Sequence, residues 1–281
     1  MRGVFNLTLD AAHELPLLAR SKQTGINKLR VLFTFLKISL KLFTIHRIRR
    51  IEQENILGFS ISTFDYGALH FLFREIFVKN VYFFGRHKQK KLLIFDCGAN
   101  VGMATFYFKW LYPDSEIYAF EPDPTTFRLL EKNIAQNGTR NVHLFNMALF
   151  ARKGKANFFV DTQNPGWLTM SIFAKRFPNG RRIKVPADRL SSYIRRNVDF
   201  LKMDIEGAED EVFKDLVRSK KIGLIKQMAV EYHFDKGDPS KFVRFLNFLK
   251  KGDFRIELSS EPGGNNSDLQ DIMVYAYKNK K

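Results

Sequence analysis

The sequence of 281 residues lacks the features that define several large protein classes. A single cysteine, Cys97, excludes an internal disulfide and, with it, the small secreted proteins that depend on disulfides. No group of cysteines and histidines has the spacing of a zinc site, so we expect no structural zinc. Acidic residues are also scarce: 29 Asp and Glu stand against 46 Lys and Arg, which leaves a net charge of +17. This charge favours an anionic partner such as nucleic acid, a phosphate-rich substrate or an acidic membrane surface.

Nothing in the sequence has the pattern of a signal peptide or of a membrane-spanning helix. Residues 1–20 contain acids and no continuous apolar run before a cleavage site, which predicts a cytoplasmic protein. The stretch Lys28–Ile48 is mostly apolar, but Lys37 and Lys41 interrupt it, whereas a membrane span requires about 20 apolar residues. Its polar residues recur at helical spacing along one stripe. They are Arg30, Thr34, Lys37, Lys41, Thr44 and Arg47.

Two interpretations of this amphipathic stretch are open. It can lie on an anionic membrane surface, which would make the protein peripheral at the membrane. Alternatively, it can pack on the protein's own core with its basic edge in solvent. Up to Lys91 the chain carries 16 Lys and Arg but only 6 Asp and Glu. We therefore expect a basic, largely helical extension over residues 1–75 and a second domain over residues 76–281.

Short apolar runs alternate with amphipathic stretches from Leu92 onward, which is typical of βα units. The whole chain is 45% hydrophobic and 14% aromatic, so it can bury a large core, and intrinsic disorder is excluded. The pattern predicts an α/β protein with one doubly wound, mostly parallel sheet of seven strands. The seven runs are residues 92–96, 116–121, 142–149, 198–204, 227–233, 254–260 and 271–277.

A turn with two glycines follows the first of these runs. It reads DCGANVG, so Gly98 and Gly102 fall between a strand and the next helix. In an open parallel sheet, ligands bind beyond the carboxyl ends of the strands, where glycine lets the backbone approach them. The second run ends in Glu121, which can accept hydrogen bonds from both hydroxyls of a ribose. Together the two features predict a nucleoside site.

The residues of the turn and their spacing favour S-adenosylmethionine over a nicotinamide cofactor. A dinucleotide site requires G-x-G-x-x-G, which seats a pyrophosphate on the helix N-terminus. Here three residues separate the glycines, which follow Asp96, whose carboxylate suits the cationic amino-acid end of S-adenosylmethionine. We therefore predict binding of this cofactor by Asp96, Gly98, Asn100, Gly102, Glu121, Asp123 and Asp204.

Acidic residues crowd the ends of the fourth and fifth runs. Three of them, Asp204, Glu206 and Glu209, lie within six residues, and such crowding signals a metal, a base or a cationic ligand. We interpret Asp204 and Glu206 as functional and place Glu209 in the first turn of a helix, where the macrodipole favours negative charge. Glu231 and His233 point to the same side of their strand. His233 is the candidate general base, oriented by Glu231 or Glu206.

A metal site is the alternative at this sheet edge. Asp204, Glu206 and His233 could hold a divalent cation that lowers the pKa of an acceptor hydroxyl, and their oxygen-rich set suits magnesium or manganese. The loop of residues 163–182 would cover the acceptor. Its aromatic and basic content fits a sugar with a phosphate or carboxylate and comes from Trp167, Lys175, Arg176, Arg181 and Arg182.

The motifs FDCGANVG, FEPDP, VDFLKMDIEGAE and VEYH resemble those of the FkbM-type S-adenosylmethionine-dependent methyltransferases, over residues 76–277. The segment DIEGAE is the most specific. The resemblance implies a class I methyltransferase, Rossmann-like sheet with its last strand antiparallel, and methyl transfer to an oxygen, often of a sugar or glycan. The rival interpretation is an RNA or other nucleic-acid methyltransferase or binding protein that uses the basic surface. Against it, most of the excess charge lies in the N-terminal third and no base-stacking motif is present.

Overall fold

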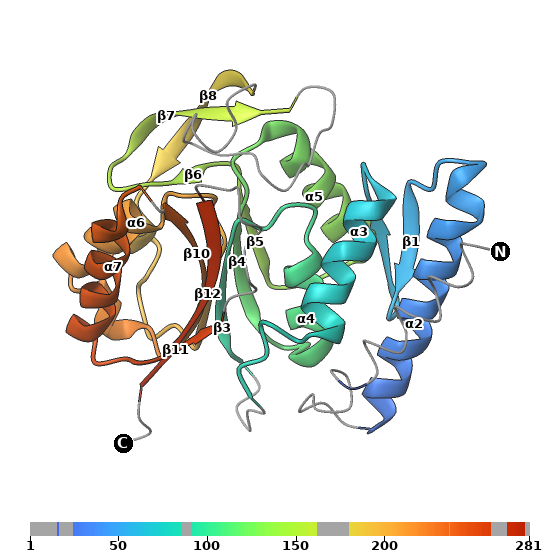
Figure 1. Ribbon diagram of the computed structural model, residues 1–281, viewed down its shortest axis with the longest axis horizontal. Helices are drawn as coiled ribbons and strands as arrows, with labels where there is room; N and C mark the ends of the chain where they lie inside the picture. The colour runs from blue at the N-terminus through green and yellow to red at the C-terminus, as the bar shows by residue number, and fades with distance from the viewer. Residues whose placement is uncertain are drawn as a thin grey trace.

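A seven-stranded sheet forms the centre of the molecule (Figure 1). The computed structural model describes residues 16, 25–85, 91–161, 180–235, 237–259 and 269–278. The strand order is β11-β12-β10-β9-β3-β4-β5, and β12 runs antiparallel to the other six strands. The predicted doubly wound sheet with an antiparallel last strand is therefore confirmed. The strands are β3 (Leu93–Cys97), β4 (Glu116–Phe120), β5 (Val142–Phe145), β9 (Phe200–Met203), β10 (Gln227–Asp235), β11 (Arg255–Ser259) and β12 (Leu269–Tyr277).

Helices cover both faces of this sheet, which explains why its central strands read as continuous apolar runs. Every residue of β3 and of β9 is buried. Two helices begin at a proline, which is favourable in the first turn, where the missing N–H is not needed. One face is covered by α4 (Met103–Leu111) and α5 (Pro124–Gln136), the other by α6 (Glu209–Arg218) and α7 (Pro239–Lys251) (Figure 1).

A small three-stranded sheet lies beyond the carboxyl ends of the central strands, at the top of Figure 1. The sequence predicts one strand over residues 142–149, but the chain leaves the large sheet after Phe145 and enters the small one. Its strands are β6 (Ala148–Leu149), β7 (Gly154–Val160) and β8 (Arg181–Asp188), in the order β6-β8-β7. Of the predicted acceptor loop, Trp167, Lys175 and Arg176 lie outside the described residues, whereas Arg181 and Arg182 begin β8 with exposed side chains.

The N-terminal region packs on the same core as the sheet. One face of α2 buries Val31, Phe35 and Ile38 in a cluster that also contains Phe106 and Ile117. Among the described helices, none is both long and apolar enough to cross a membrane. The elements of this region are α2 (Gly25–Phe43), β1 (Gln53–Ile56), β2 (Phe59–Ser62) and α3 (Tyr66–Phe73), with short helical turns at Ile45–Arg47 and Arg74–Val78. Outside this region, short helical turns also lie at Leu190–Ser192 and Lys221–Leu224.

The basic stripe of α2 is not simply a solvated edge. Lys37 and Lys41 both pair with Glu54 of β1, at 3.0 and 2.8 Å, and Glu54 is only 3% exposed. Tyr66 also donates a hydrogen bond to this carboxylate. Burial alone would raise the pKa of Glu54, but the two lysines and Tyr66 outweigh it and lower the pKa. The two lysines therefore neutralise a buried carboxylate of the protein itself.

Candidate active site

A pocket opens at the carboxyl ends of β3, β4 and β9, where the strand order reverses. Its empty volume is about 850 Å³, measured out to its open mouth. Three regions of the chain that are far apart in sequence build its walls. They are the turns after the three strands (Gly98, Asn100, Glu121, Asp204, Glu206), the small sheet with the residue before its first strand (Met147, Leu149, Phe158) and the N-terminal region (Leu72, Ile76, Tyr82).

The glycine turn after β3 lies directly against the turn after β9. Gly98 has a φ of +81°, and a Cβ atom on it would lie 1.7 Å from the carbonyl oxygen of Asp204. The Asp204 amide donates a 3.0 Å hydrogen bond to the Cys97 carbonyl, which holds the two turns together. Only glycine fits this position. Gly102 has a different role, because it starts α4 with positive φ, packs against Leu130 and is not among the pocket-lining residues.

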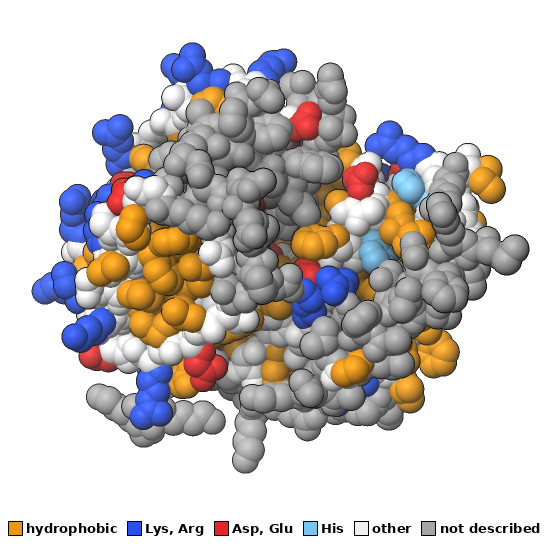
Figure 2. All heavy atoms as spheres, viewed as in Figure 1, with side chains coloured by type: hydrophobic (Ala, Val, Ile, Leu, Met, Phe, Trp, Pro, Cys, Tyr) orange, Lys and Arg blue, Asp and Glu red, His pale blue; other side chains and the backbone are white. Residues whose placement is uncertain are grey.

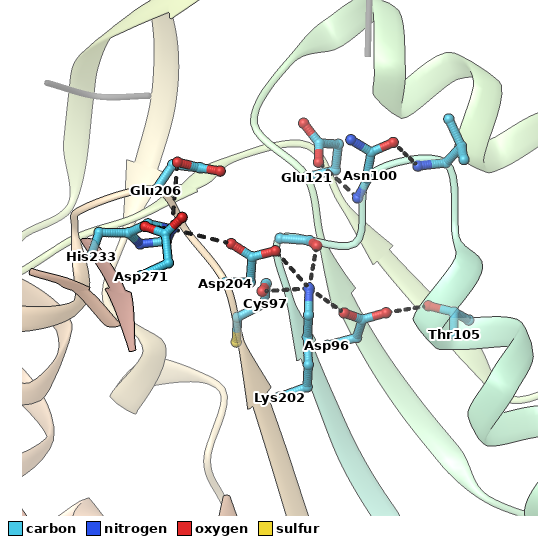
Figure 3. Close-up of polar contacts among 12 residues, drawn as sticks. Asp96, Cys97, Asn100, Thr105, Glu121, Lys202, Asp204, Glu206, His233 and Asp271 are labelled. Atoms are coloured by element: carbon cyan, nitrogen blue, oxygen red, sulfur yellow. Dashed lines mark hydrogen bonds and ion pairs between the residues drawn. The ribbon is translucent and has the colours of Figure 1, made fainter. Parts of the chain in front are cut away.

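The carboxylate of Glu121 is positioned by two backbone amides. It accepts 2.9 Å hydrogen bonds from the N–H groups of Asn100 and Asp123, one on each oxygen. Each oxygen keeps a further lone pair, so the group can accept both hydroxyls of a ribose. Burial raises the pKa of Glu121 to about 8, although the two amides act in the opposite direction. The structure thus places Glu121 as the sequence predicts, at the pocket (Figure 3).

We expect the affinity for a ribose-bearing ligand to rise with pH. The ribose requires the carboxylate form of Glu121, so the affinity for S-adenosylhomocysteine should grow up to about tenfold per pH unit below pH 8 and then level off. The same raised pKa has the opposite effect on the stability of the fold, which falls as pH rises. The folded chain holds this proton more tightly than the unfolded chain, so Glu121 lowers the stability of the ligand-free protein as pH rises from 4.5 to about 8.

Calorimetric titration across this pH range checks the affinity. The matched control is Glu121→Gln, which should bind more weakly and without the pH dependence. An affinity of the unmodified protein that is constant between about pH 6 and pH 8 contradicts the assignment.

The structure does not bring the carboxylates of Asp96 and Asp123 to the pocket wall. Asp96 is completely buried, accepts a 2.6 Å hydrogen bond from the Thr105 hydroxyl and lies 3.4 Å from Lys202 Nζ. Asp123 caps α5, where its carboxylate accepts from the amide and hydroxyl of Thr126, both at 2.8 Å. The direct cofactor contacts predicted for these two carboxylates are replaced by structural contacts.

Lys202 is a residue that the sequence interpretation missed. Its ammonium group lies at the pocket between the two turns and donates to the carbonyls of Gly98 (2.5 Å) and Cys97 (3.3 Å) (Figure 3). Asp204 Oδ2 is 4.0 Å away. Burial alone would lower the pKa of Lys202, but the carboxylates of Asp96 and Asp204 outweigh it and raise the pKa. The group therefore stays charged. A lysine inside an apolar strand, two residues before Asp204, was the feature of the sequence that could have indicated a functional role for Lys202.

The imidazole ring of His233 is positioned by Glu209. Its Nδ1 lies 2.8 Å from Glu209 Oε1, and both side chains are almost fully buried. Burial alone would raise the pKa of Glu209, but His233 and the Gly207 amide outweigh it and lower the pKa, so Glu209 is a carboxylate. An anionic acceptor on Nδ1 places the proton there and turns Nε2 into the basic nitrogen. The prediction for Glu209 needs correction: it lies in the first turn of α6, and it also orients His233, the role we assigned to Glu231 or Glu206.

The other nitrogen of His233 faces three carboxylates (Figure 3). Its Nε2 is 3.5 Å from Glu206, 3.8 Å from Asp204 and 3.9 Å from Asp271. Glu206 has a φ of 55°, a backbone conformation that residues other than glycine rarely adopt. Asp271 was missed, because it comes from β12, and only the antiparallel register places it opposite His233. Sequence spacing carries no signal of that register.

Glu231 lies beside this group but does not line the pocket. Burial, together with the negative charge of Asp204, raises its pKa to about 8. One ligand atom from each of Asp204, Glu206 and His233 lies within 4.8 Å of the others, and the same holds for Glu231, His233 and Asp271. One imidazole nitrogen with several carboxylate oxygens is a set that could hold a divalent cation.

Comparisons with known proteins point to one family. The profile of the Methyltransferase FkbM domain matches residues 96–256, which is more than half of the chain. Methyltransferase 1 of Beauveria bassiana is 27% identical over 231 residues, which cover 75% of this chain and 90% of the relative. The 31-O-demethyl-FK506 methyltransferase FkbM of Streptomyces tacrolimicus is 32% identical over 81 residues, covering 28% and 31%. Among solved structures, TYW2 of M. jannaschii in complex with AdoMet aligns at 14% identity and a TM-score of 0.44 over 80% of this chain and 84% of the other.

Proposed function

The chain belongs to the FkbM methyltransferase family, and we propose that it methylates a hydroxyl group of a sugar or glycan. It is an S-adenosylmethionine-dependent methyltransferase, and its relatives are named as methyltransferases. The observation that carries the proposal is the Glu209–His233 pair, because a buried histidine with an oriented ring, whose Nε2 faces the pocket-lining carboxylates of Asp204 and Glu206, suits removal of a proton from a hydroxyl. The name of the Streptomyces tacrolimicus relative also describes transfer to an oxygen.

The residues of the pocket fit S-adenosylmethionine, which supplies a methyl group on positively charged sulfur. Glu121 offers two acceptor oxygens to the ribose. Phe120, Leu149 and Phe158 form an apolar wall that suits the adenine ring. Asp204 and Glu206 supply negative charge for the cationic end of the molecule.

The chain's own contribution to the reaction is positioning and proton removal. A neutral sugar hydroxyl is a poor nucleophile, so His233 Nε2 would accept its proton as the hydroxyl oxygen bonds to the methyl carbon of S-adenosylmethionine; the methyl–sulfur bond would break and S-adenosylhomocysteine would leave. Glu209 on Nδ1, with Asp204 and Glu206 near Nε2, stabilises the imidazolium that results. The exposed side chains of Arg181 and Arg182 support an acceptor that bears a phosphate or carboxylate.

A divalent cation is a second candidate for activating the hydroxyl. The observation that favours it is the convergence of Asp204, Glu206 and His233 within 4.8 Å. Magnesium or manganese held there would lower the pKa of a bound hydroxyl. The two routes differ in one measurable respect: only the second is lost with a chelator.

The proposal is tested by transfer of a labelled methyl group from S-adenosylmethionine to separated glycan, lipid-linked sugar and RNA fractions. We expect label on sugar hydroxyls, undiminished by a chelator, and none with His233→Ala. Loss of transfer with chelator and its recovery with magnesium or manganese would assign activation to the cation. Label in RNA alone, with an affinity that falls steeply with salt, would replace the sugar acceptor with a nucleic acid.

A further inference from the structure

The outer face of α2 exposes an unusual amount of apolar surface. Of the eight large apolar side chains that are strongly exposed among the described residues, five lie between Leu29 and Ile48. The exposed fractions are 57% for Leu29, 70% for Phe33 and 52% for Leu40, with Ile45 at 49% and Ile48 at 91%. Apolar side chains protrude along the right-hand side of Figure 2, over the region where Figure 1 places α2.

These side chains form one continuous stripe on the helix. Leu29, Phe33 and Leu40 recur at helical spacing, and the half-buried Leu36 and Phe43 fill the gaps between and after them. The opposite side of α2 is already used, because it packs on the core. The helix is thus apolar on two faces, and a helix of this kind requires a second apolar environment. We call the five residues Leu29, Phe33, Leu36, Leu40 and Phe43 the outer stripe.

The charges around the outer stripe are almost all positive. Arg30, Arg49 and Arg50 are exposed, and Glu52 is the sole acidic residue between positions 25 and 52. Lys37 and Lys41, by contrast, are tied to Glu54 inside the protein. The cationic groups that can meet a partner therefore lie at the helix start and in the segment after the helix, on either end of an apolar surface.

An apolar stripe with positive charges at its ends favours one of two possible binding partners over the other. A second copy of the chain could pack its own outer stripe against this one, but the exposed arginines at the two ends of the stripe, Arg30 and Arg49, would then bring like charges together. A bilayer with anionic headgroups accepts both features, since the apolar side chains enter the acyl boundary while arginines meet the headgroups. We propose that the outer stripe of α2 docks this enzyme on an anionic lipid surface.

The test uses the full-length protein and two kinds of vesicle, phosphatidylcholine alone and phosphatidylcholine with phosphatidylserine. We expect co-sedimentation with the second kind at low salt and weaker binding as salt rises. Phe33→Ser together with Leu40→Ser should weaken this binding by about tenfold or more, because two side chains no longer leave water. The matched control is Val243→Ser, an equally exposed apolar residue (58%) on α7 at the other end of the molecule (Figure 1), which should bind as the unmodified protein does.

Two further measurements make the result decisive. The double variant must keep its thermal midpoint and its affinity for S-adenosylhomocysteine, since none of the changed residues lines the pocket, and retained folding with lost vesicle binding supports the proposal. Three results would overturn it. They are no binding to the anionic vesicles at low salt, full binding by the double variant, and a dimer of the unmodified protein that the double variant converts to a monomer, which would assign the stripe to a second copy.

Discussion

Replacing His233 by alanine is expected to lower turnover by about 10²- to 10⁴-fold, the usual contribution of a positioned general base. Affinity for S-adenosylhomocysteine should change little, because Glu121 and the glycine turn are separate from the imidazole. The matched control is His143→Ala, which removes a half-exposed histidine of β5 that pairs with Glu116 far from the pocket. Turnover and binding are measured on the same preparations, so that lost folding is not mistaken for lost chemistry.

Glu209→Gln separates orientation from proton transfer. Glutamine can still accept from Nδ1 but carries no charge, so it stabilises the imidazolium less, and we expect a smaller loss of turnover together with a shift of the acidic limb of the pH profile to lower pH. The direction follows because a neutral partner lowers the pKa of the imidazole, and the reaction requires the basic form of the imidazole, which is then populated at lower pH. Unchanged turnover in His233→Ala removes the residue from the mechanism altogether.

The positions that the sequence predicts well are those fixed by strand ends. A parallel sheet brings the carboxyl ends of its strands to one edge, so Gly98, Glu121 and Asp204 meet at the pocket once their runs are recognised as strands, and His233 lies beside Asp204. No long-range contact has to be known for this. The residue type then indicates the chemistry, as it does for the carboxylate of Glu121.

The roles of the misassigned residues depend on strand register and tertiary contacts, which the sequence of a single strand does not contain. Asp271 reaches His233 only through the register of the antiparallel strand β12. Glu209 reaches it because the turn after β9 brings the first residue of α6 over the imidazole. Asp96 looked like a cofactor ligand because its neighbour Lys202, more than 100 positions away in sequence, was not recognised as its partner. A buried charge meets its partner through a tertiary contact, and the residue types at one edge of the sheet do not identify that partner.

The same limit applies to α2. Helical spacing predicts which residues share a stripe, and it did so for Lys37 and Lys41. It does not say which stripe meets the protein, and Glu54 on β1 decides that. Two lysines of the basic stripe make an internal contact, and an apolar stripe is left on the outside of the helix.

Lys202→Met is expected to destabilise the protein by about 3–5 kcal/mol, because it leaves the fully buried Asp96 without its countercharge. Asp96→Asn should cost less, since Lys202 keeps the carbonyls of Gly98 and Cys97 and stays near Asp204. A surface control, Lys214→Met, breaks an exposed pair with Glu211 and should cost about 1 kcal/mol or less.

The double variant Asp96→Asn with Lys202→Met gives the sharper result. With no buried charge left unpaired, it should recover much of the stability lost by Lys202→Met alone, which denaturant unfolding of the four proteins measures as a coupling energy. Its affinity for S-adenosylhomocysteine, like that of Lys202→Met, should be lower than that of the unmodified protein, because the glycine turn has lost the ammonium group that holds the two carbonyls. Additive losses of stability would show that Asp96 and Lys202 are not partners. Full recovery of affinity would show that Lys202 serves only to neutralise Asp96, and that the turn keeps its shape through the Cys97 and Asp204 backbone alone.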